Sequence, residues 1–328
     1  MRDDLAKWAA ERAPALLAQA EEEALVVLRD ALVAAALGEE KREQATPSPP
    51  PSGPMPEPEA GELLWAYCVA PAGDRQPPAR TGIEPGTEVQ AIEASGLVAL
   101  VSRVPRAEFG EAPLRRNLND LAWLERVARA HESVLDEALE ATTIVPLRLC
   151  TLFESEDGVR EMLEREGRAL RDALELLRGR QEWSAKVIVD PDKVAAEARA
   201  RSDQAQAFED ELEDVGGGGA YMLRRRLERH LREVGASLVR ELAHEVHGRL
   251  EEHALDSVTR PPQNRELSGH EGDMILNAAY LVEAERVGEL RDVATQLEAQ
   301  HEALGARVEL SGPWPPYNFV PTGAATIA

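Results

Sequence analysis

The chain has few aromatic residues, few cysteines and no long apolar run. Only 4% of its 328 residues are Phe, Trp or Tyr, and its two cysteines are Cys68 and Cys150. Two isolated thiols in apolar, strand-like stretches form neither a disulfide framework nor a zinc site, so we expect both to be buried structural residues. The longest apolar stretches, residues 24–28 and 31–37, are too short to span a membrane.

Basic residues are also scarce. The chain has 60 Asp and Glu against 37 Lys and Arg, which gives a formal net charge of −23 at pH 7. This charge repels phosphate groups, so we expect neither nucleic acid nor an anionic membrane as a partner. The N-terminal stretch MRDDLAKWAAER has acids where a secretory signal requires basic and then apolar residues. The sequence therefore favours a soluble cytoplasmic protein.

Composition and periodicity divide the chain into five segments. Apolar residues recur every three or four positions over residues 16–37, which predicts an amphipathic helix. That helix is either a tethered contact or oligomerisation module or a helix folded onto its own body. The segments are a helical extension, a proline-rich linker, an N-terminal α+β domain, a second domain and a C-terminal strap, at residues 1–45, 46–61, 62–183, 184–312 and 313–328.

The N-terminal domain is predicted to be mixed α+β with a mainly antiparallel sheet. Stretches rich in β-branched and aromatic residues, bounded by turn residues, predict its strands, and three- to four-residue apolar spacing predicts its helices. The expected strands are residues 63–70, 88–94, 96–104 and 143–153, with the second and third forming a hairpin. The expected helices begin near Asn117 and span residues 157–177.

The second domain is predicted to be ferredoxin-like. Its expected elements are a strand, long helical stretches, two strands, a helix and a last strand, at residues 184–190, 191–253, 255–260, 274–283, 286–304 and 306–312. Strand, helix, strand, strand, helix, strand is the ferredoxin-like order. The Gly216–Gly219 run lacks the Lys-Ser/Thr of a phosphate-binding loop and is interpreted as a hinge before a helix.

Two groups of residues on the long helical stretch, three histidines and five arginines, are candidates for a functional site. His244, His247 and His253 are spaced by three and six residues, which does not match a zinc-protease helix, so solvated histidines are expected. Five arginines interleave with Glu228 and Glu233 and form either a solvated, salt-bridged face or a docking site for an acidic partner. They are Arg224, Arg225, Arg226, Arg229 and Arg232.

Arg148 is a charged residue in the apolar stretch VPLRLCTLF. Such a side chain must find a partner or reach the surface, and His131 and Glu132 are candidate partners. Both a structural ion pair and a functional polar site remain open. No catalytic triad, isolated carboxylate pair, metal-ligand spacing or cofactor fingerprint is present, so the sequence predicts no enzyme, no metal and no cofactor.

The stretch SGPWPPYNFV, residues 311–320, places three prolines and three aromatic rings near the end of the chain. Because each proline restricts its own φ and the residue before it, we expect a semi-rigid extended strap. Its rings are too large to remain in water. The strap is predicted to cross a sheet or domain junction with Trp314 and Phe319 inserted, or to form a binding surface.

Six stretches taken together resemble one family: HESVL, VPLRLCTLF, EWSAKV, GAYMLRRR, NAAYLV and GPWPPYNFV. In this order they are similar to the gas vesicle accessory proteins F and L, over residues 62–320. Leu149 and Cys150 stand where the family usually has Phe and Gly. Residues 1–58 lie outside the resemblance.

The resemblance implies a two-domain α+β body with a ferredoxin-like C-terminal domain. It also implies an accessory role in gas vesicle formation, in which the chain binds the hydrophobic shell protein and limits its aggregation, in the cytoplasm and at the vesicle. The candidate partner-binding residues are Trp314, Pro315, Pro316, Tyr317, Phe319, Arg148 and His131. The alternative is a cytosolic ferredoxin-like protein that binds a small ligand or acts as an enzyme, with Arg148 and His131 in its pocket.

Overall fold

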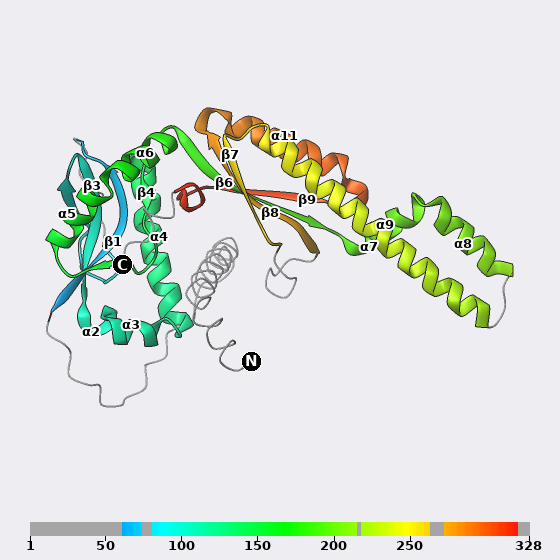
Figure 1. Cartoon of the computed structure of the whole chain (residues 1–328), viewed down its shortest axis with the longest axis horizontal. Helices are drawn as coiled ribbons and strands as arrows, with labels where there is room; N and C mark the ends of the chain where they lie inside the picture. The colour runs from blue at the N-terminus through cyan, green and yellow to red at the C-terminus, as the bar shows by residue number, and fades with distance from the viewer. Residues whose placement is uncertain (1–60, 74–80, 215–217, 263–271, 321–328) are drawn as a thin grey trace, which may run out of the picture. The chain divides into compact units, whose positions relative to one another are not determined.

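The structure is a computed structural model that describes residues 61–73, 81–214, 218–262 and 272–320. The expected helical extension, nearly all of the linker and the end of the tail lie outside these residues. The chain divides into two compact units, Met1–Leu63 with Val104–Glu132, and Leu64–Arg103 with Ser133–Ala328. Figure 1 traces the chain from β1 to the C-terminal strap.

The described part of the first unit is mainly helical. It contains α2 (Arg106–Phe109), α3 (Glu111–Asn117) and the start of α4 (Leu121–Ala141). The Trp123 ring packs on Phe109 with ring centroids 5.5 Å apart, and its indole Nε1 donates to Glu108 Oε1. Asp120 caps α4 by accepting from Ala122 N. The sequence predicted α4 but missed α2 and α3, which are too short to show a helical period.

Most of the first sheet lies in the second unit. Its strands are β1 (Glu62–Pro71), β2 (Gln90–Ala94), β3 (Leu97–Pro105), β4 (Val145–Pro146) and β5 (Leu152–Phe153). The order is β2-β3-β1-β4, with β5 also paired to β1. Pairing is antiparallel between β2 and β3 and from β1 to both β4 and β5. Helices α5 (Glu156–Arg165) and α6 (Gly167–Leu177) contribute to the core that contains this sheet.

The predicted bounds of two elements in this region are wrong. The single strand predicted over residues 143–153 is two short strands separated by a turn, in which the backbone N and hydroxyl of Thr151 both donate to Arg148 O. Cys150 adopts a left-handed φ of 66° in that turn and is only partly buried, so it does not lie in a strand as expected. The helix predicted over 157–177 breaks at Glu166 into α5 and α6.

The second sheet contains β6 (Arg180–Val189), β7 (Asp256–Arg260), β8 (Asp273–Glu283) and β9 (Arg307–Trp314). The strand order is β7-β8-β6-β9, and every neighbouring pair is antiparallel. Between β6 and β7 the chain forms α7 (Pro191–Ala200), α8 (Asp203–Asp214) and α9 (Gly218–Glu251), and between β8 and β9 it forms α11 (Val287–Gln300). Three short 3₁₀ turns are Ala284–Arg286, Glu302–Leu304 and Tyr317–Phe319.

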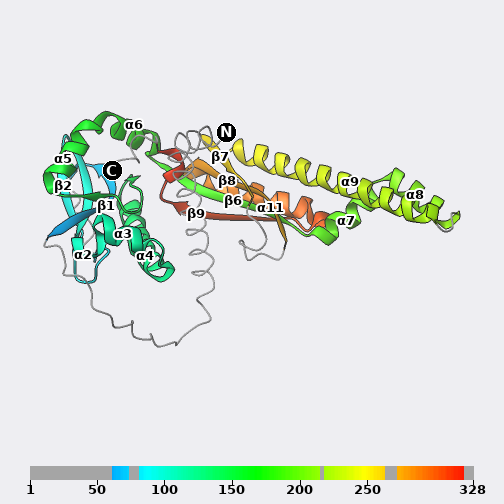
Figure 2. The same ribbon diagram turned by 60° about the horizontal axis from the view of Figure 1, so that its bottom comes forward.

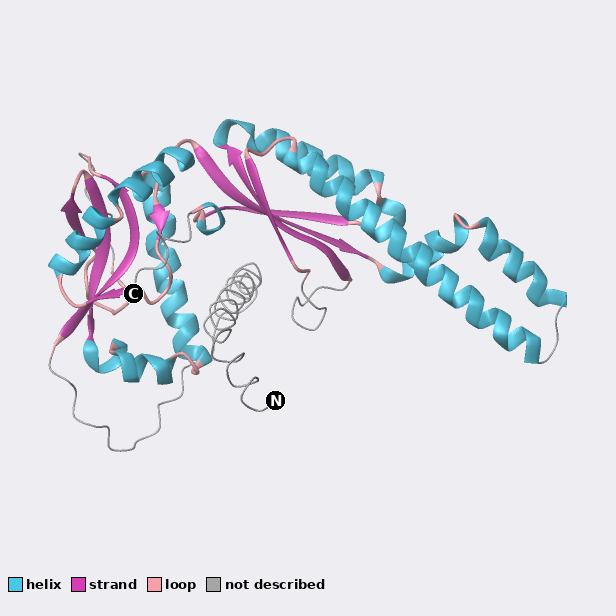
Figure 3. Cartoon of the chain, viewed as in Figure 1, coloured by secondary structure: helices cyan, strands magenta, loops and turns pink. Residues whose placement is uncertain are grey.

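Helices α9 and α11 cover one face of this sheet, as Figures 1 and 2 show. The side chains of β6 alternate accordingly: Trp183, Ala185 and Val187 join the core under the helices. Glu182 and Ser184 point to the opposite face and are nevertheless buried. Figure 3 shows the four strands crossing as a twisted layer beside the helices. No helix among the described residues is both long enough and apolar enough to cross a membrane.

Candidate functional site: the C-terminal strap and the sheet face beneath it

The strap begins inside the second sheet rather than after it. Strand β9 continues to Trp314, which pairs with Glu182 of β6, so the predicted strand end at residue 312 is two residues too early. Gly312 has a φ of 149°. A Cβ atom there would lie 2.8 Å from the carbonyl oxygen of Glu182 and 2.9 Å from Cδ2 of Trp183. Only glycine therefore allows the strap to approach β6 this closely.

The second half of the strap is largely buried. Pro315, Pro316 and Phe319 are buried, and Phe319 is 6% exposed. Phe319 belongs to the same core cluster as Leu281 of β8 and Leu64 of β1. The strap therefore contributes a ring to a core that also contains residues of both sheets, as expected for Phe319.

The other two rings of the strap are less covered. Trp314 and Tyr317 are partly buried, and Trp314 Nε1 donates to Ser311 Oγ over 3.2 Å. Trp314 and Tyr317 are thus the aromatic side chains of the strap that remain partly exposed to solvent. Trp314 is therefore less completely inserted than predicted.

Asn318 connects the strap to the polar face of the second sheet. Its backbone N donates to Glu182 Oε2 over 3.1 Å, and its side-chain Nδ2 donates to Glu182 Oε1. Its Oδ1 accepts from Arg260 Nη2 of β7. Glu182 is fully buried, so these contacts hold a carboxyl group that would otherwise be costly to remove from water.

Neither Asn318 nor Glu182 is among the residues that the sequence predicts for the site. The available signal was modest: Glu182 alternates with apolar residues in a strand, and Asn318 stands between two aromatic residues. A polar residue in either context needs a partner when the segment is buried. Pairing them requires the register between β6 and β9, which brings together residues 136 positions apart.

The structure places the other two candidate residues in different compact units. His131 is fully buried in α4 and belongs to the first unit. Arg148 belongs to the second unit, where it lies partly buried in the turn between β4 and β5. No salt bridge joins Arg148 to another residue in the described part of the chain.

Two of the three predicted helix histidines are not simply solvated, and His253 lies in the turn after α9, which ends at Glu251. His247 Nδ1 lies 2.8 Å from the hydroxyl of the buried Tyr280, whose pKa is raised by burial. His253 Nδ1 lies 3.2 Å from Glu289, and Arg286 and His253 together lower the pKa of that carboxyl. His244 is exposed, as expected. Within the described ranges no group of three or more His, Cys, Asp or Glu could hold a metal ion.

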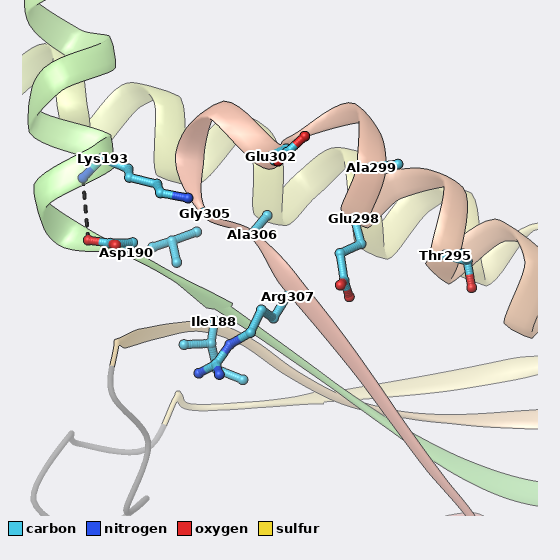
Figure 4. A pocket seen from close by; sticks show the side chains of 11 residues that line it. Ile188, Asp190, Lys193, Thr295, Glu298, Ala299, Glu302, Gly305, Ala306 and Arg307 are labelled. Atoms are coloured by element: carbon cyan, nitrogen blue, oxygen red, sulfur yellow. Dashed lines mark hydrogen bonds between the residues drawn. The ribbon is translucent and has the colours of Figure 1, made fainter.

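One open cleft of about 520 Å³ lies at the end of the second sheet. Figure 4 shows its lining from β6 and α7, from α11 and from the start of β9. Asp190 accepts from the backbone N of Asp192 and Lys193 and so caps α7, and Glu298 accepts from Val308 N. Neither Arg148 nor His131 lines this cleft, contrary to the pocket in the alternative hypothesis.

Comparison with known proteins connects this architecture to gas vesicles. Residues 63–321 match the family model described as gas vesicle synthesis protein GvpL/GvpF. The chain is 36% identical to gas vesicle protein L of a Streptomyces species over 261 residues, which cover 78% of this chain and 92% of that protein. It is 25% identical to gas vesicle protein L of Haloferax mediterranei, over 74% of this chain and 73% of that protein.

Two crystal structures share the fold. The gas vesicle protein GvpF of Anabaena aligns with a TM-score of 0.62 at 19% identity, over 80% of this chain and 99% of that one. GvpF of Microcystis aeruginosa aligns with a TM-score of 0.57 at 19% identity, over 79% of this chain and 99% of that one. The mixed α+β fold with two antiparallel sheets is therefore that of known gas vesicle proteins.

Proposed function

The chain belongs to the GvpL/GvpF family of gas vesicle proteins, and we propose that it binds the gas vesicle shell protein and limits its aggregation during vesicle formation. The observation that carries this proposal is the family match, which spans nearly all of the described residues. The matched descriptions name gas vesicle proteins rather than enzymes. We place this activity in the cytoplasm and at the gas vesicle, with other gas vesicle proteins as further partners.

The physical argument concerns apolar surface. A shell subunit with a large apolar face aggregates unless that face is covered before it enters the wall. A carrier with a net charge of −23 keeps such a complex dispersed, because like-charged complexes repel each other. The carrier also needs a local apolar contact, and the partly exposed rings of Trp314 and Tyr317 provide one on a rigid segment.

Co-expression with shell protein, followed by sedimentation and pull-down, tests this function. The chain is expected to keep shell protein in the supernatant and to be recovered with it. Trp314→Ala with Tyr317→Ala should weaken recovery, whereas Leu255→Ala, which removes an apolar side chain that is 53% exposed elsewhere, should not. Equal pelleting of the shell protein with and without the chain, and no recovered complex, would refute the proposal.

We also propose that the second sheet and its helices form a ferredoxin-like domain, and that the domains are residues 62–183 and 184–312. The strand order β7-β8-β6-β9 supports this, because β6 and β8 are central, and the strand after each of them is reached through helix and pairs with the outer side of the other central strand. An independently expressed fragment that begins at Arg180, and so keeps all of β6, should then unfold cooperatively. A fragment without cooperative unfolding would contradict the boundary.

The cleft of Figure 4 supports a second candidate, small-ligand binding. Its charged side chains come from α7 and its N-cap, α11, the turn Glu302–Leu304 and β9, but Asp190 and Glu298 already accept hydrogen bonds from backbone N–H groups. A thermal-shift screen with metabolites tests this candidate, since a ligand at 100 times its Kd stabilises the fold by about 2.7 kcal/mol. Uniformly unchanged melting temperatures would count against it.

A further inference from the structure

Helices α8 and α9 form a hairpin whose two members carry opposite charge. Helix α8 has six acidic residues and no basic residue. The first half of α9 carries the five arginines named above, interrupted only by Glu228 and Glu233. The two charged helices are adjacent in the structure, and the loop that joins them lies outside the described residues.

These opposite charges do not neutralise each other within the hairpin. A small apolar cluster occupies the seam, formed by Ala205 and Phe208 of α8 with Leu223 and Leu227 of α9. Across the part of the chain that the structure describes, none of the five arginines forms a salt bridge, and Glu209, paired with Arg199, is the one acid of α8 that does. The five arginines are exposed, as a solvated face predicts, but the expected salt bridges are absent from this part of the chain.

The outward edge of α9 is a mainly basic stripe that also includes the exposed Glu228. Arg225, Arg229 and Arg232 are spaced by four and three residues, so they share one helical face, and all three are exposed. Tyr221 begins the stripe four residues before Arg225, whose guanidinium lies 5.7 Å from the Tyr221 ring centroid. Tyr221 and Met222 are 58% and 61% exposed, the highest values among the large apolar residues of the described chain.

The outward edge of α8 is a matching acidic stripe. Asp203, Asp210 and Asp214, which span the helix from end to end, are exposed on the side opposite to Ala205 and Phe208, and Glu211 is exposed beside them. Helix α8 spans 12 residues, about 18 Å at 1.5 Å per residue, and the segment from Tyr221 to Arg232 has the same length. The two edges therefore match in length and are opposite in sign.

We propose that this hairpin joins copies of the chain, the basic edge of α9 in one copy packing against the acidic edge of α8 in the next. A second copy presents a helix of the required charge and length, and Tyr221 and Met222 add apolar surface to the contact. The net charge of −23 opposes association over long distances. At physiological ionic strength, however, the Debye length is about 8 Å, so distant repulsion is screened more than contacts within the interface.

The contact is heterologous, because the surface used on one copy differs from the surface used on the other. Each added copy leaves one basic and one acidic edge free. Association should therefore continue beyond a dimer as concentration rises, unless the geometry closes a ring. This proposal does not depend on binding of the shell protein.

Sedimentation velocity of the full chain tests the proposal. The weight-average mass should rise with protein concentration and fall toward the monomer value in 1 M salt, where the Debye length is about 3 Å. The variant Arg225→Glu, Arg229→Glu, Arg232→Glu should remain monomeric. The variant Asp210→Lys, Glu211→Lys, Asp214→Lys should also remain monomeric, and mixing the two variants should restore association.

A control variant has the same change in net charge as the arginine variant, but its three substitutions lie outside the hairpin. Arg115→Glu, Arg168→Glu and Arg178→Glu replace side chains that are 76%, 95% and 68% exposed, and this variant should associate like the wild type. Circular dichroism should show the same helix content in all variants. A monomeric wild type at every concentration, or a mixture of the two hairpin variants that stays monomeric, would overturn the proposal, even if the chain still bound shell protein or another acidic partner.

Discussion

Replacing Asn318 by alanine should destabilise the fold by about 3 kcal/mol. The substitution removes the Nδ2 donor to Glu182 and the Oδ1 acceptor of Arg260, but it keeps the backbone N–H that donates to Glu182. A hydrogen bond to a charged group contributes roughly 1.5–3 kcal/mol, so two such bonds set an upper range of about 3–6 kcal/mol. The retained backbone bond and local relaxation favour the low end.

Urea unfolding followed by tryptophan fluorescence measures this loss, because the chain has five tryptophans. The urea midpoint should fall while the slope of the transition stays unchanged. A double-mutant cycle with Glu182→Gln should give a coupling energy of about 1–3 kcal/mol, since the two side chains interact directly. A loss below about 1 kcal/mol for Asn318→Ala, or a coupling energy near zero, would show that the strap does not depend on this contact.

Three further predictions follow from buried groups. Phe319→Ala should cost about 3–5 kcal/mol in urea unfolding and Phe319→Leu less than about 1.5, whereas equal small losses would place the ring outside the core. Burial raises the pKa of Tyr67 from 10.0 to about 12. The free energy of unfolding should therefore be unaffected by this hydroxyl below pH 10 and should fall by up to about 2.7 kcal/mol as the pH rises toward 12. A free energy of unfolding that does not change over this alkaline range would contradict the prediction. Burial raises the pKa of the Cys68 thiol to about 12, so a disulfide reagent at pH 8 should modify the partly exposed Cys150 first, and rapid native modification of Cys68 would be the contrary result.

The strands of the second sheet were predicted in the right order because their apolar residues alternate with polar ones or form short continuous runs, although β6 begins at Arg180, four residues before the predicted start. In β6, Trp183, Ala185 and Val187 alternate with Glu182 and Ser184, and the pattern identifies both the strand and its two faces. The long helical stretch was also correct in type. Its division into α7, α8 and α9 depends on interruptions near residues 201–202 and on the segment before Gly218.

The first sheet was predicted less well because its short strands depend on turn chemistry. Residues 143–153 have the composition of one strand, but Thr151 hydrogen-bonds the carbonyl of Arg148 with both its backbone N and its hydroxyl. Cys150 takes the left-handed conformation that this turn requires. Composition alone does not distinguish such a turn from a continued strand.

The candidate site was predicted in part for a similar reason. Three large rings beside three prolines indicated a rigid strap, and Phe319 is buried as expected. The contact from Asn318 to Glu182 joins residues 136 positions apart, and no local pattern carries that information. The arginines of α9 were visible in the sequence, but the apolar seam between α8 and α9 depends on how the two helices pack.

The contacts of the strap also explain why GPWPPYNFV is so specific a stretch. Gly312 is required by the close approach to β6, Pro315 and Pro316 are buried, Asn318 bonds Glu182, and Phe319 enters the core. Each of these residue types is required by a contact within the fold. The stretch is therefore better evidence for the fold than for a binding surface. The proposed binding of the shell protein uses either the strap's partly exposed rings or a surface elsewhere on the chain. The paired ring substitution proposed above separates these two cases, because removing the rings affects shell recovery only if the strap itself is the contact.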